Sequence, residues 1–282
     1  MSELQTLMTG ISFGESPRWH DGRLWFADWG AEELIAVGLD GDAEVIVPVH
    51  SFPFCIDWLP DGTLLVVSSR DCSVLAMDGD RSLAPYADLS PFSDKGWNEI
   101  VVDGRGNAYV NGGGFDLMAG EAFAPGIVVL LTPDGGARQV ADEIAFPNGM
   151  AVMPDNRTLI VAESYAGRLA AFTIGEDGSL GDRRVWADLG DAAPDGICID
   201  ASGAVWYADV PHRCCVRVAE GGAVLDRIEL DRGCFSCALG GRDDRTLFMV
   251  TREWNGSASI AEDRRSGQLV TANAPEPGAG WP

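Results

Sequence analysis

A short β-rich segment recurs six times along the 282 residues at nearly constant spacing. The six copies are LWFAD (24–28), LLVVS (64–68), AYVNG (108–112), LIVAE (159–163), VWYAD (205–209) and LFMVT (247–251). Their starts are 40, 44, 51, 46 and 42 residues apart. A period of about 40–50 residues with several short strands per repeat is typical of a β-propeller with one blade per copy.

The turns between these segments also indicate β-structure. The chain contains 35 glycines, and many follow an aspartate, as in Asp21-Gly22, Asp40-Gly41, Asp61-Gly62, Asp78-Gly79, Asp103-Gly104, Asp134-Gly135 and Asp177-Gly178. Asp-Gly between alternating apolar runs is a hairpin signal, because glycine adopts a positive φ without strain.

We therefore predict an all-β fold, a six-bladed β-propeller with four antiparallel strands per blade. Residues 1–282 are expected to form a single domain without a long helix. Residues 3–9 are expected to add an outer strand to the final blade and so close the ring. A pair of β-sandwiches is the structural alternative, but it would not require six regular copies.

The charge of the chain restricts its partners. Lys and Arg number 20 against 43 Asp and Glu, which gives a formal net charge of −23. Such a field repels phosphate backbones and anionic lipid, so we expect neither nucleic acid nor a membrane as a partner. A small-molecule substrate is expected instead, and the sequence predicts no particular oligomeric state.

The location is predicted to be cytoplasmic. No run of 18 apolar residues and no secretory signal occurs in the sequence, and the seven cysteines are an odd number in a large chain, which is typical of reduced thiols. Cys234-Phe-Ser-Cys237 has the spacing of a redox or zinc motif, but no second such pair accompanies it. We expect these cysteines to serve packing.

We expect the innermost strand of each blade to precede each recurring segment. Superposing the six inner strands brings one position into register at the mouth of the central channel, and it holds Glu15, Phe54, Asn98, Asn148, Asp195 and Ser236. Four of the six are carboxylates or amides. Their oxygens are hard ligands suited to Ca²⁺, Mg²⁺ or Mn²⁺, and two carboxylates balance one divalent cation. The alternative is that Asn148-Gly149 and Asp195-Gly196 are only turn residues.

The same residues carry a resemblance. The chain resembles the SMP-30/gluconolactonase/regucalcin family of six-bladed propellers over roughly residues 11–251. The matching pieces are Gly14-Glu15-Ser-Pro17, Asn98-Glu-Ile-Val-Val-Asp103, Pro147-Asn148-Gly149-Met150, Pro194-Asp195-Gly196-Ile-Cys-Ile-Asp200 and Cys234-Phe-Ser-Cys237-Ala-Leu-Gly-Gly241. They recur in the family's order.

The resemblance implies a metal-dependent lactonase. It implies one divalent cation held by Glu15, Asn148 and Asp195, with Ca²⁺ favoured and Zn²⁺, Mn²⁺, Mg²⁺ or Fe²⁺ as alternatives. Asn98 would bind substrate or complete the metal shell. The chain departs from many sugar lactonases of this kind, which carry an arginine where this chain has Gly96, with Trp97 next to Asn98. That departure indicates a flatter or more apolar ring as substrate.

The expected chemistry is attack of water on a lactone carbonyl that the cation polarises. Asp195 is the expected catalytic residue and would accept the proton of that water. If Asp195 is only a ligand, hydroxide on the metal could attack directly.

Loops after the second strands are expected to form the walls of the substrate site. They offer Trp29, Phe115, Tyr165, His212 and Trp254, and Phe115, Tyr165 and His212 are expected to contact substrate together with Trp97 and Asn98. Residues 113–126 and 252–265 are the longest such loops and could act as lids.

Two other functions remain open. One keeps the metal and replaces the lactone with a phosphotriester or an aryl ester. The other is a non-catalytic propeller that binds Ca²⁺ or a protein, since a fold alone does not determine function.

Overall fold

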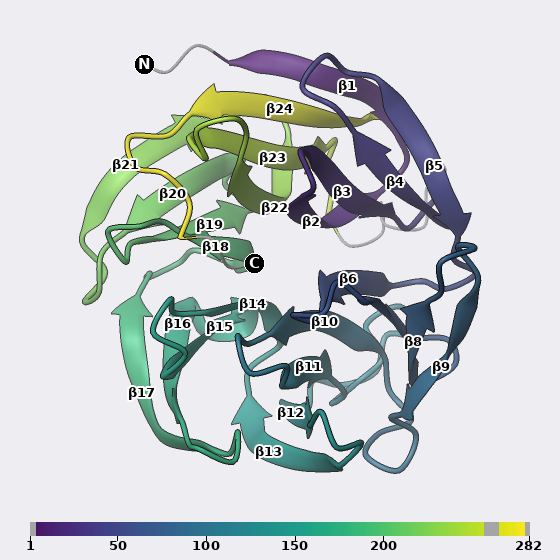
Figure 1. The fold of residues 1–282 in the computed structure, drawn as a ribbon. Coiled ribbons are helices and arrows are strands. Elements are labelled where there is room, and N and C mark those ends of the chain that lie inside the picture. Colours follow the sequence, from purple (N-terminus) through teal and green to yellow (C-terminus); the bar gives the residue numbers. More distant parts are fainter. Residues whose placement is uncertain (1–3, 257–264, 280–282) are drawn as a thin grey trace.

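The computed structural model describes residues 4–256 and 265–279. Within these residues, 24 strands form six antiparallel sheets of four strands, arranged in a ring (Figure 1). The described residues contain no α-helix, and η1 (Ser164–Ala166) is a single 3₁₀ turn. The predicted six-bladed β-propeller is confirmed. No helix of the described residues is long and apolar enough to cross a membrane.

The first three blades follow the chain from the inner strand outward. Blade 1 consists of β2 (Gly14–His20), β3 (Arg23–Asp28), β4 (Glu33–Val37) and β5 (Ala43–Pro48). Blade 2 consists of β6 (Phe54–Trp58), β7 (Leu64–Ser68), β8 (Ser73–Met77) and β9 (Leu83–Asp88). Blade 3 consists of β10 (Trp97–Val102), β11 (Ala108–Gly112), β12 (Gly126–Leu131) and β13 (Ala137–Ile144).

The last three blades repeat this order, except that the start of the chain supplies the outer strand of blade 6. Blade 4 consists of β14 (Pro147–Val152), β15 (Thr158–Glu163), β16 (Arg168–Ile174) and β17 (Leu180–Asp188). Blade 5 consists of β18 (Pro194–Ile199), β19 (Val205–Asp209), β20 (Cys214–Val218) and β21 (Val224–Glu229). Blade 6 consists of β22 (Gly233–Gly240), β23 (Thr246–Arg252), β24 (Gly267–Asn273) and β1 (Gln5–Ile11).

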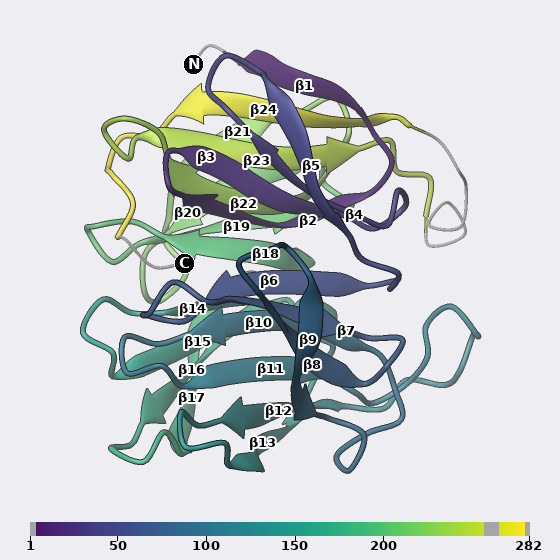
Figure 2. The same ribbon diagram turned by 45° about the vertical axis from the view of Figure 1, so that its right-hand side comes forward.

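The ring closes where β1 pairs with β24. The two strands lie side by side, one purple and one yellow (Figures 1 and 2), with Gln5 opposite Thr271 and Ile11 opposite Gly267. The predicted outer strand is confirmed, but it spans residues 5–11 and not 3–9. This pairing joins the start of the chain to its end and completes blade 6 as a four-stranded sheet.

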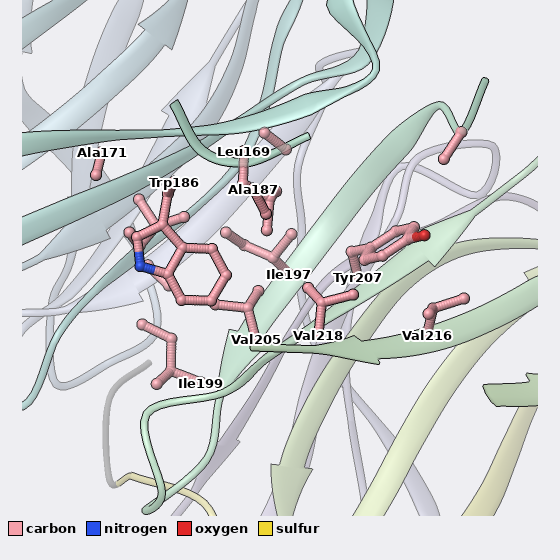
Figure 3. Packing of buried hydrophobic residues seen from close by; sticks show 14 of the residues in the cluster. Leu169, Ala171, Trp186, Ala187, Ile197, Ile199, Val205, Tyr207, Val216 and Val218 are labelled. Carbon is pink, nitrogen blue, oxygen red and sulfur yellow. The ribbon is translucent and has the colours of Figure 1, made fainter. Parts of the chain in front are cut away.

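The core lies between the blades. Six layers of buried aliphatic and aromatic side chains separate neighbouring sheets, one layer at each seam. Figure 3 shows the seam of blades 4 and 5, where Trp186 lies among the branched side chains of Ile197, Ile199 and Val205. The strands are buried on both faces, which explains why the recurring segments are almost continuously apolar.

The two faces of the ring differ in their turns. Every inner strand begins at one face, here called the mouth, and the Asp-Gly turns lie at the other. Asp61-Gly62 is representative: Gly62 has a φ of +89° and the Asp61 carboxylate accepts the N–H of Thr63 at 2.9 Å. The loops between second and third strands return to the mouth.

Candidate metal site and its surroundings

The strand register places the four predicted oxygen donors at equivalent positions of the mouth. In blades 1, 3, 4 and 5, the last residue of the second strand pairs with the first residue of the inner strand: Asp28 with Gly14, Gly112 with Trp97, Glu163 with Pro147, and Asp209 with Pro194. The next residue of the inner strand is Glu15, Asn98, Asn148 and Asp195 respectively. A β-bulge follows in each of these ladders and changes the direction of the strand locally.

The other two blades depart from the predicted superposition. In blade 6 both strands extend one residue further, so that Gly233 pairs with Arg252; Thr251, which corresponds to Asp209 in the repeat, pairs with Cys234, so the equivalent position is Phe235 and not Ser236. In blade 2, Phe54 is itself the partner of Ser68 and is followed by Cys55. The blade 2 ladder has no bulge at this point, and sequence spacing alone does not reveal that difference.

The two asparagines contact each other directly. The Asn98 Nδ2 donates to the Asn148 Oδ1 at 3.0 Å and to the Pro147 carbonyl at 3.4 Å. The Asn148 Nδ2 donates to the Ser164 Oγ at 3.3 Å, and the Asn111 Nδ2 donates to the Asn148 main-chain oxygen at 2.6 Å. Asn148 is thus held from both sides.

The two carboxylates of the mouth share an acidic environment. Burial is the main factor that raises the pKa of Glu15 well above its ordinary value, and the negative charges of Asp195 and Glu99 raise it further. Burial, followed by the charge of Glu99, likewise raises the pKa of Asp195, while a hydrogen bond from the Asn148 side chain opposes this effect. Among the described residues, no basic side chain forms an ion pair with Glu15 or Asp195.

These residues fit a divalent cation. No group of three or more His, Cys, Asp or Glu side chains in the described ranges is arranged to hold a metal ion, so amide oxygens would have to complete the shell. Two carboxylates and two amides are such a set, and their hard oxygens suit Ca²⁺ or Mg²⁺. A cation would also offset the burial and the repulsion that raise both pKa values.

A second acidic pair lies deeper and has its own counter-charge. The buried Arg18 donates through Nη2 to the Glu99 Oε1 at 3.1 Å and to the Ile100 carbonyl at 2.8 Å, and its Nε lies 3.9 Å from the Asp57 Oδ1. The Asp57 carboxylate also accepts the N–H groups of Trp58 and Val102. Burial raises the pKa of Asp57 to about 6 in spite of Arg18.

Several residues around the site were not predicted. Glu99, Asn111 and Ser164 all hydrogen-bond to the site or to residues beside it. One signal was available, because Glu99 stands in an inner strand directly before the apolar run Ile100-Val101-Val102. A buried charge in an inner strand is rare unless it is paired.

The Trp97 side chain does not reach the site. It is fully buried in the seam between blades 2 and 3, among residues such as Cys55, Leu65 and Val110. Neighbouring residues of a strand point to opposite faces, so Asn98 and Trp97 diverge. A ring without exposed surface has no face to offer a substrate.

His212 lies in the loop after β19 and pairs with two aspartates. Its Nδ1 lies 2.9 Å from the Oδ2 of the buried Asp209, and its Nε2 lies 3.8 Å from the Asp191 Oδ2. Asp209 is the ladder partner of Pro194, the residue before Asp195. The structure therefore brings His212 to the blade 5 side of the mouth.

Phe115 and Tyr165 come together in an aromatic cluster at the rim. Their ring centroids are 6.0 Å apart, and Phe123 lies 5.6 Å from each of them. Phe146 stacks on Tyr165 with a centroid distance of 4.6 Å. Tyr165 and Phe123 are about half exposed. The chain's one lysine anchors the loop between β11 and β12, because the Lys95 Nζ lies 2.8 Å from the Glu121 Oε1.

A second aromatic cluster covers the opposite part of the mouth. Phe13 contacts Trp29, Phe52 and Phe235, and Phe235 contacts Trp254. The Trp29 Nε1 donates to the Phe54 carbonyl at 2.5 Å. Most of the predicted lid at 252–265 lies outside the described residues.

The cysteines serve packing. Five of them, including Cys234 and Cys237, are buried in the seams of blades 4 to 6. The Cys198 and Cys237 sulfurs lie 3.8 Å apart, at hydrogen-bonding distance and without a disulfide.

Fold and site together define a class: a six-bladed propeller whose channel mouth presents two carboxylates and two amides suited to a divalent cation. The chain belongs to the SMP-30/Gluconolactonase/LRE-like family, whose sequence model matches residues 13–253.

Relatives with names are similar along much of the chain. A pentonolactonase of Haloferax volcanii is 25% identical over 279 residues, which cover 96% of this chain and 93% of the relative. A 6-deoxy-6-sulfogluconolactonase of Pseudomonas putida is 29% identical over 151 residues, 52% of each chain. The solved structure of a calcium-binding regucalcin from Agrobacterium tumefaciens has a TM-score of 0.79 at 20% identity, and the match covers 98% of this chain and 97% of that one.

Proposed function

We propose that this protein is a divalent-cation-dependent hydrolase of small-molecule lactones. The observation that carries the proposal is the convergence of Glu15, Asn98, Asn148 and Asp195 at one level of the mouth, with both carboxylates lacking a basic ion-pair partner among the described residues. The family and the two lactonases among the relatives support the reaction class.

We assign the cation to Glu15, Asn148 and Asp195. The regucalcin that shares the fold is described as calcium-binding, which supports Ca²⁺ as the first choice, with Zn²⁺, Mn²⁺, Mg²⁺ and Fe²⁺ as alternatives. When bound, a divalent cation polarises a carbonyl and stabilises the oxyanion that forms on attack by water.

The chain's own residues supply the remaining functions. Asp195 is proposed to accept the proton of the attacking water, because its carboxylate lies at the assigned cation, beside the carbonyl that the water would attack. Asn98 is proposed to orient the lactone through its amide. Phe115 and Tyr165 would form an apolar wall on one side, and His212 a polar one on the other.

A second candidate is an aryl ester or phosphotriester as substrate. The half-exposed rings of Phe123 and Tyr165 favour it, since aromatic faces stack on aryl leaving groups. The same panel of substrates distinguishes the two candidates.

The test is hydrolysis of a lactone panel followed by a pH indicator, on chelator-stripped protein with each divalent cation added back separately. We expect turnover only after a cation is restored, and its loss in Glu15→Gln with the fold unchanged by circular dichroism. Cation binding without turnover of any lactone or ester would favour a binding protein. Full turnover by Glu15→Gln would refute the site assignment.

A further inference from the structure

The side chain of Asn148 is held in one orientation by a neighbour that belongs to no predicted site. Ser164 opens the 3₁₀ turn after β15, and its Oγ donates to the Pro194 carbonyl at 2.7 Å. A carbonyl oxygen only accepts hydrogen bonds, so this bond uses the single proton of the hydroxyl.

With its proton used in this bond, the Ser164 oxygen can only accept a further hydrogen bond. The amino group of the Asn148 amide donates to it, with the Asn148 Nδ2 3.3 Å away. On the other side, the Asn98 Nδ2 donates to the Asn148 Oδ1 at 3.0 Å. If the amide turned over, its nitrogen would face the donor Asn98 and that bond would be lost, and Ser164 could keep a bond to Asn148 only by giving up its bond to Pro194.

We infer that Ser164 is a positioning residue of the cation site: it fixes the Asn148 amide so that its oxygen, and not its nitrogen, is the atom offered as a ligand. Through the Pro194 carbonyl, the same hydroxyl fixes the chain immediately before Asp195. One serine thus positions two of the three assigned ligands, Asn148 and Asp195. This inference rests on the proposed function, because it takes Asn148 and Asp195 as ligands.

The turn that presents Ser164 is itself firmly held. The preceding Glu163 side chain is fully buried, and its carboxylate pairs with Arg168 at 3.0 Å and with Arg183 at 2.8 Å. It also accepts the Ala145 N–H at 3.1 Å, which connects it to the segment leading into Asn148. The hydroxyl therefore stands on a rigid support, as positioning requires.

The first experiment measures Ca²⁺ binding by calorimetry on chelator-stripped protein. Loss of a residue that orients a ligand typically weakens metal affinity by about 10- to 100-fold. We expect at least a tenfold higher Kd for Ser164→Ala and a Kd close to that of the wild type for Ser164→Thr, which keeps the hydroxyl. Ser179→Ala is the matched control, since Ser179 is also half-buried and lies in blade 4 at the opposite face, bonded to Asp177.

A Kd for Ser164→Ala within twofold of the wild type, with wild-type binding intact, would overturn the inference and leave the proposed function standing. Absence of wild-type binding to Ca²⁺, Mg²⁺ and Mn²⁺ would refute the cation itself.

A second measurement does not depend on the cation. The side-chain NH₂ signal of Asn148, assigned by its absence in Asn148→Asp, should exchange with solvent at least tenfold faster in Ser164→Ala than in wild type or Ser164→Thr. An unchanged exchange rate would overturn the proposed orientation.

Discussion

Two acidic pairs lie close together at the centre of the ring, and they differ in what balances their charges. At the mouth, Glu15 and Asp195 have no basic ion-pair partner among the described residues. Burial raises the pKa of both carboxyls, and the charge of Asp195 raises that of Glu15 further. Below them, Asp57 and Glu99 share Arg18. Arg18 balances the deeper pair within the chain, and we propose that a cation from outside balances the mouth pair.

The two pairs should differ most in their effect on turnover. Asp195→Asn keeps the shape of the side chain but removes the proposed proton acceptor and one negative ligand. We expect kcat to fall by about 10²- to 10⁴-fold, the usual contribution of a positioned acid or base. The unfolding temperature of the cation-free protein should not fall, since a partly buried and repelled charge is removed. A rate within threefold of the wild type would show that Asp195 is not the base.

Arg18→Met should show the reverse pattern. The variant leaves Asp57 and Glu99 buried without their cation, and breaking a buried pair in this way typically costs about 3–5 kcal/mol. Urea unfolding measures the loss. Adding Glu99→Gln to Arg18→Met should recover part of it, and equal stability of the single and double variants would contradict the ion-pair assignment.

The pH dependence of stability follows from the raised pKa values. A carboxyl whose pKa is higher in the folded state binds protons more readily there than in the unfolded chain, so its contribution to stability increases as pH falls. For Asp57 that window lies between about 6 and the ordinary value of 3.8, and Glu15, Glu99 and Asp195 act in the same direction. We expect the cation-free protein to unfold at a higher temperature at pH 5 than at pH 8.

Ca²⁺ should act mainly on the mouth pair. Because the cation binds the ionised carboxylates, it should raise the unfolding temperature more at pH 8 than at pH 5. Glu15→Gln with Asp195→Asn should abolish this calcium effect and retain the part of the pH dependence due to Asp57 and Glu99. A calcium effect that persists in the double variant would place the cation elsewhere.

The smallest effect on catalysis is expected at the aromatic rim, which lies near the mouth pair and away from the deeper pair. Tyr165→Ala removes a half-exposed ring that stacks on Phe146. A single aromatic contact is worth about 0.5–1.5 kcal/mol, so we expect KM to rise by about 2- to 12-fold with kcat little changed. Tyr86→Ala is a control, since Tyr86 is also exposed but lies in the outer strand β9. An unchanged KM for Tyr165→Ala would exclude the ring from the substrate site.

The sequence was sufficient for the fold and for placing four residues in register at the mouth, because both depend on the repeat, whereas the role of these residues as ligands stays a prediction. Six apolar segments at a regular spacing define the blades, and superposing them aligns Glu15, Asn98, Asn148 and Asp195 without any knowledge of contacts. Blade 2 shows the limit of this reasoning: one missing β-bulge changes which residue stands at the mouth.

Side-chain direction was the main obstacle for the rest. Trp97 was expected beside Asn98 at the substrate, but strand alternation turns it into the seam. Arg18, Asp57 and Glu99 meet from three different blades, so no local spacing connects them. The role of Ser164 depends on which neighbour takes its single proton, and only the three-dimensional structure reveals that.

The joining of β1 to β24 has a consequence for how the protein folds. Gln5 and Thr271, which meet there, are 266 positions apart in sequence. Contacts of such separation form slowly, because the loop entropy is lost before the contact compensates for it. The candidate ligands come from blades 1, 4 and 5, and blade 1 reaches blade 5 only through the closing blade 6 or around the whole ring. The ability to bind a cation should therefore be acquired late in folding, together with closure, and calcium added during refolding would stabilise only chains that have completed the ring.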